Sequence, residues 1–333
     1  MKIAFAGFRH GHIFSLYDMA KEHNSYEIVG AFEEDETARN LAVSKGVNFN
    51  FKTYLDLLDS DAQVVAIGSA FGDRGKMAIE ALKRGKHVIC DKPLCTSLEE
   101  LNEIEKLSKK KGLVASCYFT MRYDGRLIAV KELIDSGRLG KINNVYFGGQ
   151  HPLQYGRRPA WYFEKGKHGG VINDIAIHGV DLLSYLFDGK VEKINGARCW
   201  NAYAKEEPNF LDSAQFMLTL NNGAGVVADV SYAIPDGVEF NLPYYWQFFI
   251  WGTEGMMGFT LCETQLEKGE KSPCSYYLKN VKQPFALIDK ENLNYLTDFL
   301  KVVNNDSDAV LNVQEVIDST RATLEIQNAS NND

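Results

Sequence analysis

The sequence predicts an α/β domain built on a doubly wound parallel sheet, followed by an α+β domain with a large, mostly antiparallel, open-faced sheet. Up to about residue 120, short β-branched runs alternate with helical periodicity, which is typical of crossover units in a parallel sheet. After residue 121, longer strand-like runs follow one another with turn residues between them. We therefore expect two domains, residues 1–120 and 121–333, with the C-terminal helices packing back on the body.

In the first domain, short apolar runs predict the strands, and helical spacing lies between them. The strands are expected at residues 2–7, 26–32, 62–70, 86–93 and 113–119, and the helices after residue 12 and at residues 77–85 and 96–112. Thr96 and Glu99 have the spacing of a capping box, and Gly112 is placed to end that last helix.

In the second domain, a helix leads into a strand, an irregular segment and a second helix before the strand-rich part begins. The helices are expected at residues 126–140 and 171–187, the strands at 141–149, 191–200, 214–234, 244–261 and 275–280, and two closing helices at 292–305 and 312–326. Asn222-Gly223 and Glu254-Gly255 supply turns between the long strands.

Composition excludes several classes of protein. A net charge of −8 argues against nucleic acid or an anionic membrane as a main partner. No apolar run approaches the roughly 18 residues of a membrane helix, and the first run is too short for a signal peptide. The six cysteines are scattered without a C-x-x-C pair, which favours a reduced, cytoplasmic protein without a zinc site.

The stretch from Gly7 to His12, GFRHGH, joins the first strand to the first helix. A nucleotide-binding turn uses one glycine for the bend, a second for close approach to the pyrophosphate and a third for helix–strand packing. Gly7 meets the first demand, whereas Arg9 and His12 stand in the other two places. We expect Arg9 to turn outward toward a phosphate oxygen and Gly11 to take over part of the packing task.

Glu33 ends the second strand a little over 20 residues after this loop. An acidic side chain there accepts hydrogen bonds from the adenosine ribose and repels a 2′-phosphate. Glu34 and Asp35 add negative charge and no arginine follows directly. We therefore expect a Rossmann domain that prefers NAD over NADP, although a solvated acidic turn is the simpler alternative.

Two further motifs carry a family resemblance. Gly85 to Pro93 reads GKHVICDKP, and Gly169 to His178 reads GGVINDIAIH. In this order, they resemble the glucose–fructose oxidoreductase/inositol dehydrogenase (Gfo/Idh/MocA) family of NAD(P)-dependent oxidoreductases. The resemblance includes Arg122, placed after the sixth strand, and it covers nearly the whole chain.

The resemblance implies a dehydrogenase that holds its substrate, a sugar, inositol or related polyol, between the first domain and the open sheet. It makes Lys92, Asp174 and His178 the catalytic set. We expect the cofactor to contact Gly7, Phe8, Arg9, His10, Gly11, His12, Glu33, Ser69, Arg74, Asp91, Lys92 and Arg122.

The chemistry of the three catalytic candidates agrees with this role. Hydride leaves a carbinol carbon only as its hydroxyl proton departs, and histidine is a base near neutrality. Asp174 lies four residues before His178 on one predicted helix, so it can orient the imidazole or hold a second hydroxyl. Lys92 can polarise the substrate oxygen or hold the nicotinamide ribose. No cysteine pair or second histidine lies at ligand spacing on this helix, so we expect catalysis without a metal.

The chain also departs from the family pattern around the cofactor. Asp91 replaces the usual glutamate, and Ser69 and Arg74, placed after the fourth strand, stand where a proline and a histidine are usual in the family. Together with Arg9 and His12, these changes predict an altered cofactor pocket.

Two aromatic stretches are open to more than one interpretation. The irregular segment at residues 151–170 carries Tyr155, Arg157 and Trp161, which we expect to bind substrate together with Lys92, Asp174 and His178, unless they only anchor a long loop. The run from Tyr244 to Trp251 alternates aromatic residues with period two. We interpret Trp246, Phe248 and Ile250 as one face of the sheet and as the contact of a homodimer or homotetramer.

Two other functions remain open from the sequence. Some relatives keep NAD bound and use transient oxidation for glycoside cleavage or elimination. A non-catalytic NAD-binding regulator is the other alternative, against which the joint presence of Lys92, Asp174 and His178 counts.

Overall fold

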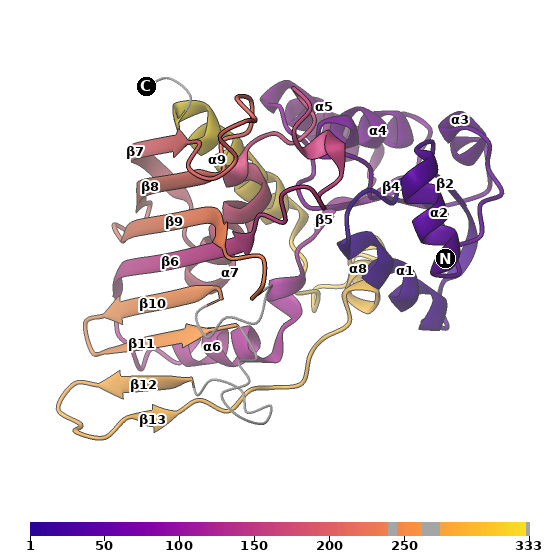
Figure 1. Ribbon diagram of the computed structural model, residues 1–333. Helices are drawn as coiled ribbons and strands as arrows, with labels where there is room; N and C mark the ends of the chain where they lie inside the picture. Colours follow the sequence, from indigo (N-terminus) through magenta and orange to yellow (C-terminus); the bar gives the residue numbers. More distant parts are fainter. Residues whose placement is uncertain (239–244, 262–273, 331–333) are drawn as a thin grey trace. The chain divides into compact units, whose positions relative to one another are not determined.

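The computed structural model describes residues 1–238, 245–261 and 274–330 (Figure 1). The chain forms two compact units: the first contains Met1–Phe119, Pro159–Gly169 and Asn294–Arg321, and the second contains Thr120–Arg158, Gly170–Leu293 and Ala322–Asp333. Two segments that follow residue 121 in the sequence thus belong to the first unit. Tyr244, the first residue of the aromatic run, and Cys262, one of the six cysteines, lie outside the described residues.

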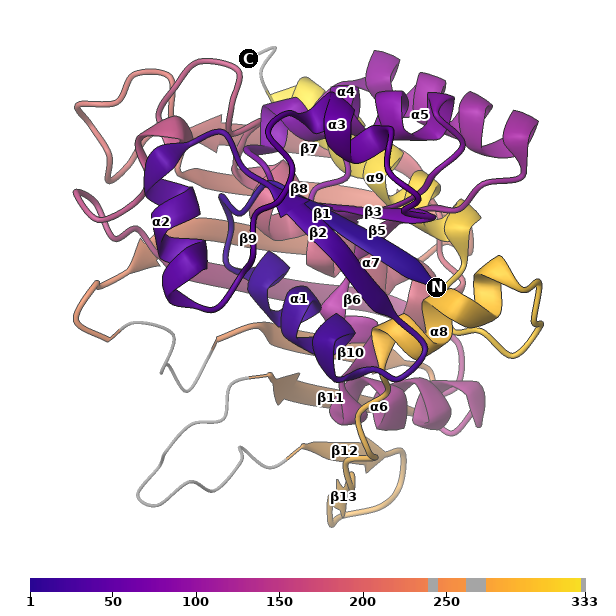
Figure 2. The ribbon, with the colours of Figure 1, turned by 90° about the vertical axis from the view of Figure 1, so that its right-hand side faces the viewer.

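The first unit is built on a parallel five-stranded sheet in the order β2-β1-β3-β4-β5 (Figure 2). Its strands are β1 Lys2–Ala6, β2 Glu27–Phe32, β3 Val64–Ile67, β4 His87–Asp91 and β5 Ala115–Tyr118. Every residue of β3 and β5 is buried, as expected where both faces of a parallel sheet are covered. All five strands predicted from apolar runs are confirmed. The sequence-based strand count was one too high, because Ser69 follows the third strand and Arg122 follows the fifth.

Helices connect these strands and cover the sheet. They are α1 His12–Glu22, α2 Glu36–Ser44, α3 Tyr54–Leu58, α4 Phe71–Lys83, α5 Leu98–Lys111 and α8 Tyr295–Val303, with a 3-10 turn, η2, at Ala160–Tyr162. The predicted start of α5 is wrong by one residue, because the Ser97 side chain, not Thr96, accepts a hydrogen bond from the Glu100 amide at 3.1 Å. The predicted end is confirmed, since Gly112 caps the helix at φ 62°.

The second unit contains an eight-stranded sheet in the order β13-β12-β11-β10-β6-β9-β8-β7 (Figure 1). Its strands are β6 Ile142–Pro152, β7 Val191–Trp200, β8 Ser213–Leu220, β9 Gly225–Ile234, β10 Gln247–Gly252, β11 Gly255–Thr260, β12 Ser275–Leu278 and β13 Phe285–Ala286. Only the β6–β9 pair is parallel, so the mostly antiparallel sheet is confirmed. The predicted Asn222-Gly223 turn joins β8 to β9, with Gly223 at φ 87°.

The helices α6 Gly125–Asp135 and α7 Ile177–Phe187 lie along one face of this sheet (Figure 1). Phe248, which points to that face, is 2% exposed, whereas Phe249 and Trp251 on the other face are 38% and 39% exposed. The prediction that Trp246, Phe248 and Ile250 form the exposed face is therefore wrong. A period-two pattern separates two faces but does not tell which one meets the helices.

The segment that carries Asp174 and His178 is helical, as predicted, but it begins differently. Residues Ile172–Ala176 form a π-helical turn, η3, which continues directly into α7. Such turns widen a helix locally and are frequent at functional sites. A 3-10 turn, η1, at Thr120–Tyr123 and the helix α9 Val313–Ser330 complete the described elements. Among the described residues, no helix is long and apolar enough to span a membrane.

Candidate functional site

A sharp turn leads from β1 into α1 and brings the backbone close to the end of β3. Gly7 has φ 86°, and a Cβ atom on it would lie 2.5 Å from the Ser69 backbone nitrogen. The turn is tied down by two backbone hydrogen bonds, from Gly7 N to Phe32 O at 2.8 Å and from Arg9 N to Gly68 O at 2.9 Å. Only glycine fits at position 7, as the sequence pattern requires.

The Glu33 carboxylate is fixed at the end of β2 by three donors. Its Oε2 accepts from the Phe8 amide at 2.6 Å, and its Oε1 accepts from Arg9 Nε at 2.9 Å and from the Asp35 amide at 2.8 Å. A carboxylate offers about four acceptor positions, so about one remains for a ligand hydroxyl. The Arg9 guanidinium also lies 3.5 Å from Glu34 and 3.7 Å from Asp35. Arg9 thus pairs with these acids instead of turning outward as expected.

A cavity of about 510 Å³ opens beside this carboxylate. It is lined by Gly7, Arg9, Phe32, Glu33, Glu34, Lys52, Thr53, Tyr54, Ser69, Asp73, Lys76 and Met77. A fixed acid at the end of β2 beside a glycine turn suits the adenosine half of a dinucleotide. The sequence did not point to Lys52 and Thr53, which directly precede α3, or to Lys76 on α4, and none of the three belongs to a motif.

Close packing between α1 and the parallel sheet depends on Gly68 and not on Gly11. A Cβ on Gly11 would meet nothing within 4 Å, so the packing task expected of Gly11 is not found there. A Cβ on Gly68 would lie 2.6 Å from Ile13 on α1 and 2.7 Å from the Gly7 carbonyl. Gly68, at the end of β3, therefore makes room for α1, and His12 can occupy the place usual for a third glycine.

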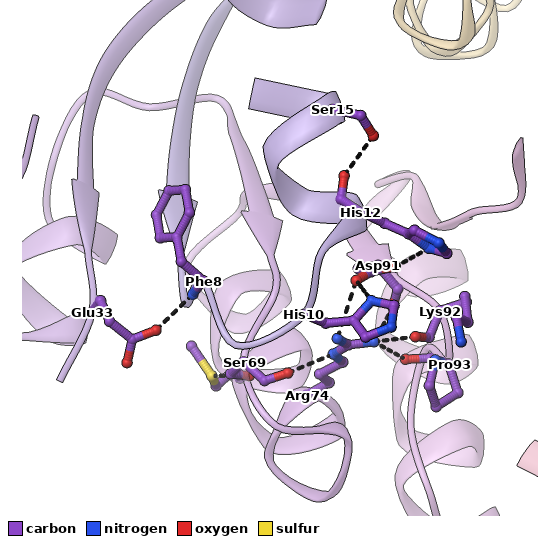
Figure 3. A network of polar contacts seen from close by, with 11 residues as sticks. Phe8, His10, His12, Ser15, Glu33, Ser69, Arg74, Asp91, Lys92 and Pro93 are labelled. Carbon is purple, nitrogen blue, oxygen red and sulfur yellow. Dashed lines mark hydrogen bonds and ion pairs between the residues drawn. The ribbon is translucent and has the colours of Figure 1, made fainter. Parts of the chain in front are cut away.

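The two loop histidines both turn toward Asp91 at the end of β4 (Figure 3). His10 Nδ1 lies 2.6 Å from Asp91 Oδ2, and His12 Nδ1 lies 3.2 Å from Asp91 Oδ1. Burial lowers the pKa of His10 to about 4, so its imidazole is neutral at pH 7. Burial alone would raise the pKa of Asp91, but His10 and the Arg74 guanidinium outweigh it and hold that pKa well below its usual range.

Arg74 supports this corner of the fold from inside (Figure 3). Its side chain is fully buried, and it donates to the backbone carbonyls of Ser69, Asp91 and Lys92 as well as to Asp91 Oδ2 at 3.3 Å. These donors are engaged within the protein, so we revise its role from cofactor contact to support of the β4 end.

Lys92 follows Asp91 directly and is only 2% exposed. Its Nζ lies 5.5 Å from the centroid of the Phe71 ring, on the first turn of α4. An ammonium group held over an aromatic face is stabilised by the ring quadrupole. Lys92 is thus presented at the carboxyl end of the parallel sheet, where ligands bind in this fold class.

Part of the irregular segment folds against α4 in the first unit. The Trp161 ring centroid lies 4.9 Å from that of Phe71, and the Gly72 amide donates to the Lys167 carbonyl at 2.8 Å. Lys167 also forms an ion pair with Asp73 at 2.7 Å. Trp161 is buried and belongs to the cofactor-side unit, so it is separated in fold from Tyr155 and Arg157, which are exposed residues of the second unit.

In the second unit, Asp174 and His178 are both buried and have aromatic neighbours. The Tyr232 hydroxyl, from the end of β9, donates a hydrogen bond to Asp174 Oδ2. The Trp246 ring meets the His178 ring edge-on, with centroids 5.7 Å apart. Gly149 on β6 makes room for Trp246, because a Cβ there would lie 2.6 Å from the indole ring. The sequence missed Tyr232, which is 58 residues from Asp174 and carries no motif.

Arg122 has a different role from the one expected. It is buried in the second unit and forms a bidentate pair with Asp181, with Nε–Oδ2 and Nη2–Oδ1 distances of 2.7 Å. A buried, doubly hydrogen-bonded pair of this kind holds η1 against α7. Lys92 belongs to the first unit and Asp174 and His178 to the second, so their joint action is part of the proposal below.

The fold and the loop define the class: a protein with a dinucleotide-binding Rossmann unit and a second, sheet-rich unit. Two family models match the chain. Residues 1–119 match the oxidoreductase family with an NAD-binding Rossmann fold, and residues 127–258 match the GFO/IDH/MocA C-terminal domain. The chain belongs to the Gfo/Idh/MocA family.

Curated relatives are similar over part of their length. The chain is 28% identical over 66% of its length to scyllo-inositol 2-dehydrogenase (NAD(+)) of Bacillus subtilis, and the match spans 61% of that protein. It is 26% identical over 66% of its length to D-xylose dehydrogenase of Paenarthrobacter nicotinovorans, spanning 59% of it. The matches thus cover about three fifths of these relatives.

Solved structures share the whole fold. A protein of Erwinia carotovora atroseptica SCRI1043 superposes with a TM-score of 0.87 at 24% identity, covering 99% of this chain and 98% of that one. An NAD-binding protein of Listeria innocua superposes with a TM-score of 0.79 at 21% identity, covering 99% and 94%.

Proposed function

We propose that this protein is an NAD-dependent dehydrogenase that transfers a hydride between NAD and a hydroxyl-bearing carbon of a sugar, an inositol or a related polyol. The observation that carries the proposal is the retention of Lys92, Asp174 and His178 in the two family motifs, each buried and held by neighbours. A regulator that only binds NAD has no use for three ionisable groups in these positions.

The residues of the first unit fit the cofactor. Gly7 lets the backbone approach the end of β3, and Glu33 retains about one acceptor position for a ribose hydroxyl beside the 510 Å³ cavity. Glu33 cannot swing away from a 2′-phosphate, because three donors fix it. Like charges at close range repel by about 1 kcal/mol or more, so we infer a preference for NAD over NADP. Lys52 and Lys76 line the same cavity, and their positive charges would attract a 2′-phosphate and so oppose the preference for NAD.

Each catalytic candidate has a distinct task in this proposal. Bound NAD would supply the acceptor for the hydride. His178 takes the proton of the reacting hydroxyl, with Trp246 against its ring to limit rotation and exclude water. Asp174, held by the Tyr232 hydroxyl, keeps a fixed carboxylate for a neighbouring hydroxyl of the substrate. Lys92 polarises the substrate oxygen as negative charge develops on it.

The substrate class rests on the relatives. The names of similar proteins include scyllo-inositol 2-dehydrogenase (NAD(+)), D-xylose dehydrogenase, levoglucosan dehydrogenase and glucose-6-phosphate 3-dehydrogenase. Their shared chemistry is a ring that carries several hydroxyl groups. A cluster of carboxylate, imidazole and indole groups suits such a ring, since it combines hydrogen-bonding groups with an apolar face.

The test is a screen of the purified protein against neutral and phosphorylated sugars and inositols, once with NAD and once with NADP, following the absorbance of reduced cofactor. We expect turnover with at least one polyol and a higher kcat/KM with NAD. The double variant Glu33→Ser, Glu34→Arg should narrow that preference, whereas Glu36→Arg, at the first residue of α2 and outside the lining of the cavity, is the matched control. Equal or better use of NADP by the parent contradicts the cofactor preference. Release of aglycone from glycosides without net reduction of NAD would instead support the NAD-retaining alternative.

We also propose that the protein is a homo-oligomer that associates through the open face of the large sheet. Residues that are at least 38% exposed on this sheet include Met217, Val227, Phe249, Trp251 and Tyr277. They come from four strands, and Phe249 and Trp251 stack with ring centroids 5.9 Å apart. An apolar patch of this kind on a soluble monomer marks an interaction surface.

A further inference from the structure

We infer that His10, His12 and Asp91 form a binding site for one divalent transition-metal ion of the zinc class. Each histidine offers one imidazole nitrogen and Asp91 offers one carboxylate oxygen, and these three atoms all lie within 4.8 Å of one another. Two histidines and one carboxylate on one side of an ion, with other positions open, is a recurring metal-binding arrangement in proteins. This inference goes beyond the proposed function, which uses no metal.

The geometry places the ligands on rigid supports. His12 is the first residue of α1, His10 lies two residues earlier in the turn, and Asp91 is the last residue of β4 (Figure 3). The two imidazole rings lie edge to face, with centroids 4.6 Å apart and planes at 82°. Each ring presents the same nitrogen to a different oxygen of one carboxylate. The 2.6 Å contact between His10 Nδ1 and Asp91 Oδ2 has to open before an ion can bind both atoms at about 2.0–2.2 Å.

A buried arginine orients one of the three candidate ligands. The Asp91 carboxylate is oriented from behind by Arg74 Nη2 at 3.3 Å, in the manner of an outer-sphere partner.

The surrounding charges select the kind of metal. Arg74 compensates the charge of Asp91, and Lys92 adds a further cationic group to the same corner. Calcium and magnesium need several oxygen ligands and a net negative site, which this corner does not offer. Zinc, cobalt, nickel and copper gain most of their affinity from imidazole nitrogen. The nearby positive charges should keep the affinity for zinc moderate, in the micromolar range.

The site is separate from the cavity assigned to adenosine. None of the three ligands is among the residues that line that cavity, although the same loop contributes to both. No sequence motif marks the site, because 79 residues separate His12 from Asp91 and the spacing His-x-His occurs by chance in many loops. The inference departs from the expectation of a protein without a zinc site, which rested on the scattered cysteines. The separate expectation of catalysis without a metal concerned Asp174 and His178, which lie in the other unit.

The experiment uses the full-length protein without a histidine tag, stripped with a chelator and titrated with Zn²⁺ by calorimetry and with Co²⁺ by visible absorption. We expect one ion per chain, a Co²⁺ spectrum typical of nitrogen and oxygen ligands, and a Zn²⁺-dependent rise in Tm. His12→Ala should weaken Zn²⁺ binding at least tenfold, and Mg²⁺ should not compete. The matched control is His23→Ala, at a histidine of the first unit whose Nε2 contacts the Thr297 hydroxyl. This variant should bind Zn²⁺ as the parent does.

Because His10 and Asp91 are more deeply buried, circular dichroism and Tm of each variant are measured first. His12 is 38% exposed at its side chain, so its variant should fold normally. Absence of stoichiometric Zn²⁺ binding, or binding that His12→Ala and His10→Gln leave unchanged, overturns the inference. NAD binding by the stripped protein is measured in parallel, so failure of the metal site and failure of the proposed function give different results.

Discussion

The two sheets of this protein bury their residues differently. In the parallel sheet, β3 and β5 are buried along their whole length, while β10 in the large sheet alternates between buried and exposed residues. The first sheet is enclosed by helices on both faces, and its polar groups gather at the carboxyl ends of its strands. The large sheet has helices on one face, and its catalytic candidates lie on the helical segment that packs there. The candidate site residues of the first unit thus lie in loops at the strand ends, and those of the second unit lie on a helical segment supported by aromatic side chains.

The largest expected effect concerns the helical segment on the large sheet. His178→Asn should lower turnover by about 10²–10⁴-fold, the usual contribution of a positioned general base, while the fold and NAD affinity change little. Asparagine keeps polarity and much of the volume, so packing against Trp246 suffers little. Steady-state turnover and fluorescence titration with NAD measure the two effects.

The matched control for this variant is His23→Asn in the first unit, where the imidazole accepts a hydrogen bond from the Ser25 amide at 3.2 Å and shares another with the Thr297 hydroxyl at 2.9 Å. It should turn over as the parent does. If the turnover of His178→Asn remains within a few-fold of that of the parent, His178 is not the base. The helical segment on the large sheet would then not supply the general base.

The second prediction compares two neighbouring residues on opposite faces of β10. Phe248→Ala should lower the free energy of unfolding by about 3–5 kcal/mol, because it opens a cavity between Phe147 and Phe259. Phe249→Ala should cost about 1 kcal/mol or less, but it should weaken self-association about tenfold or more, as expected for an aromatic residue in an interface. Urea unfolding and sedimentation velocity separate the two quantities.

A monomer of the parent near 37 kDa at micromolar concentration would contradict the interface proposal. Association that is lost in Phe248→Ala and kept in Phe249→Ala would mean that the open face has another use.

The sequence predicts the parallel sheet of the first unit better than the large sheet of the second, for a physical reason. Strands buried on both faces appear as continuous apolar runs, and all five were identified with their order along the chain. The glycine turn and Glu33 were also predictable, because each serves a backbone or charge requirement at a fixed spacing. The alternation around Phe248 showed two faces but gave their exposure the wrong way round, since both faces are aromatic.

Within the sites, the sequence identified residues and not their partners. Tyr232 with Asp174, and Asp91 with the two loop histidines, are brought together by strand ends that are 58 to 81 residues apart. Arg74 and Arg122 stood at positions expected to contact the cofactor, yet both are buried and engaged by protein groups. A sequence motif gives the position of an arginine, whereas the direction of its side chain depends on the packed fold.

The smallest expected effect concerns a buried carboxyl group in one of the helices that cover the first sheet. Glu100 Oε2 on α5 is buried without a hydrogen-bond partner among the described residues, next to Gly75 on α4. Burial raises the pKa of this carboxyl, against the opposing effects of Lys76 and the Thr96 amide. Between the ordinary pKa and the raised one, the folded state binds more protons than the unfolded state. Stability conferred by the neutral acid is therefore lost as pH rises through that window.

Glu100→Gln removes the charge and keeps the size. We expect a Tm about 1–3 °C above the parent at pH 7.5, and a smaller difference at pH 4, where the parent carboxyl is largely protonated when folded. Thermal unfolding at the two pH values measures this, and Glu99→Gln, at the exposed neighbouring position, should show no such pH dependence. A Glu100→Gln variant that is less stable than the parent at pH 7.5 would show that the carboxylate is compensated by its surroundings. The helices that cover the parallel sheet would then tolerate a buried charge, as the ends of its strands do.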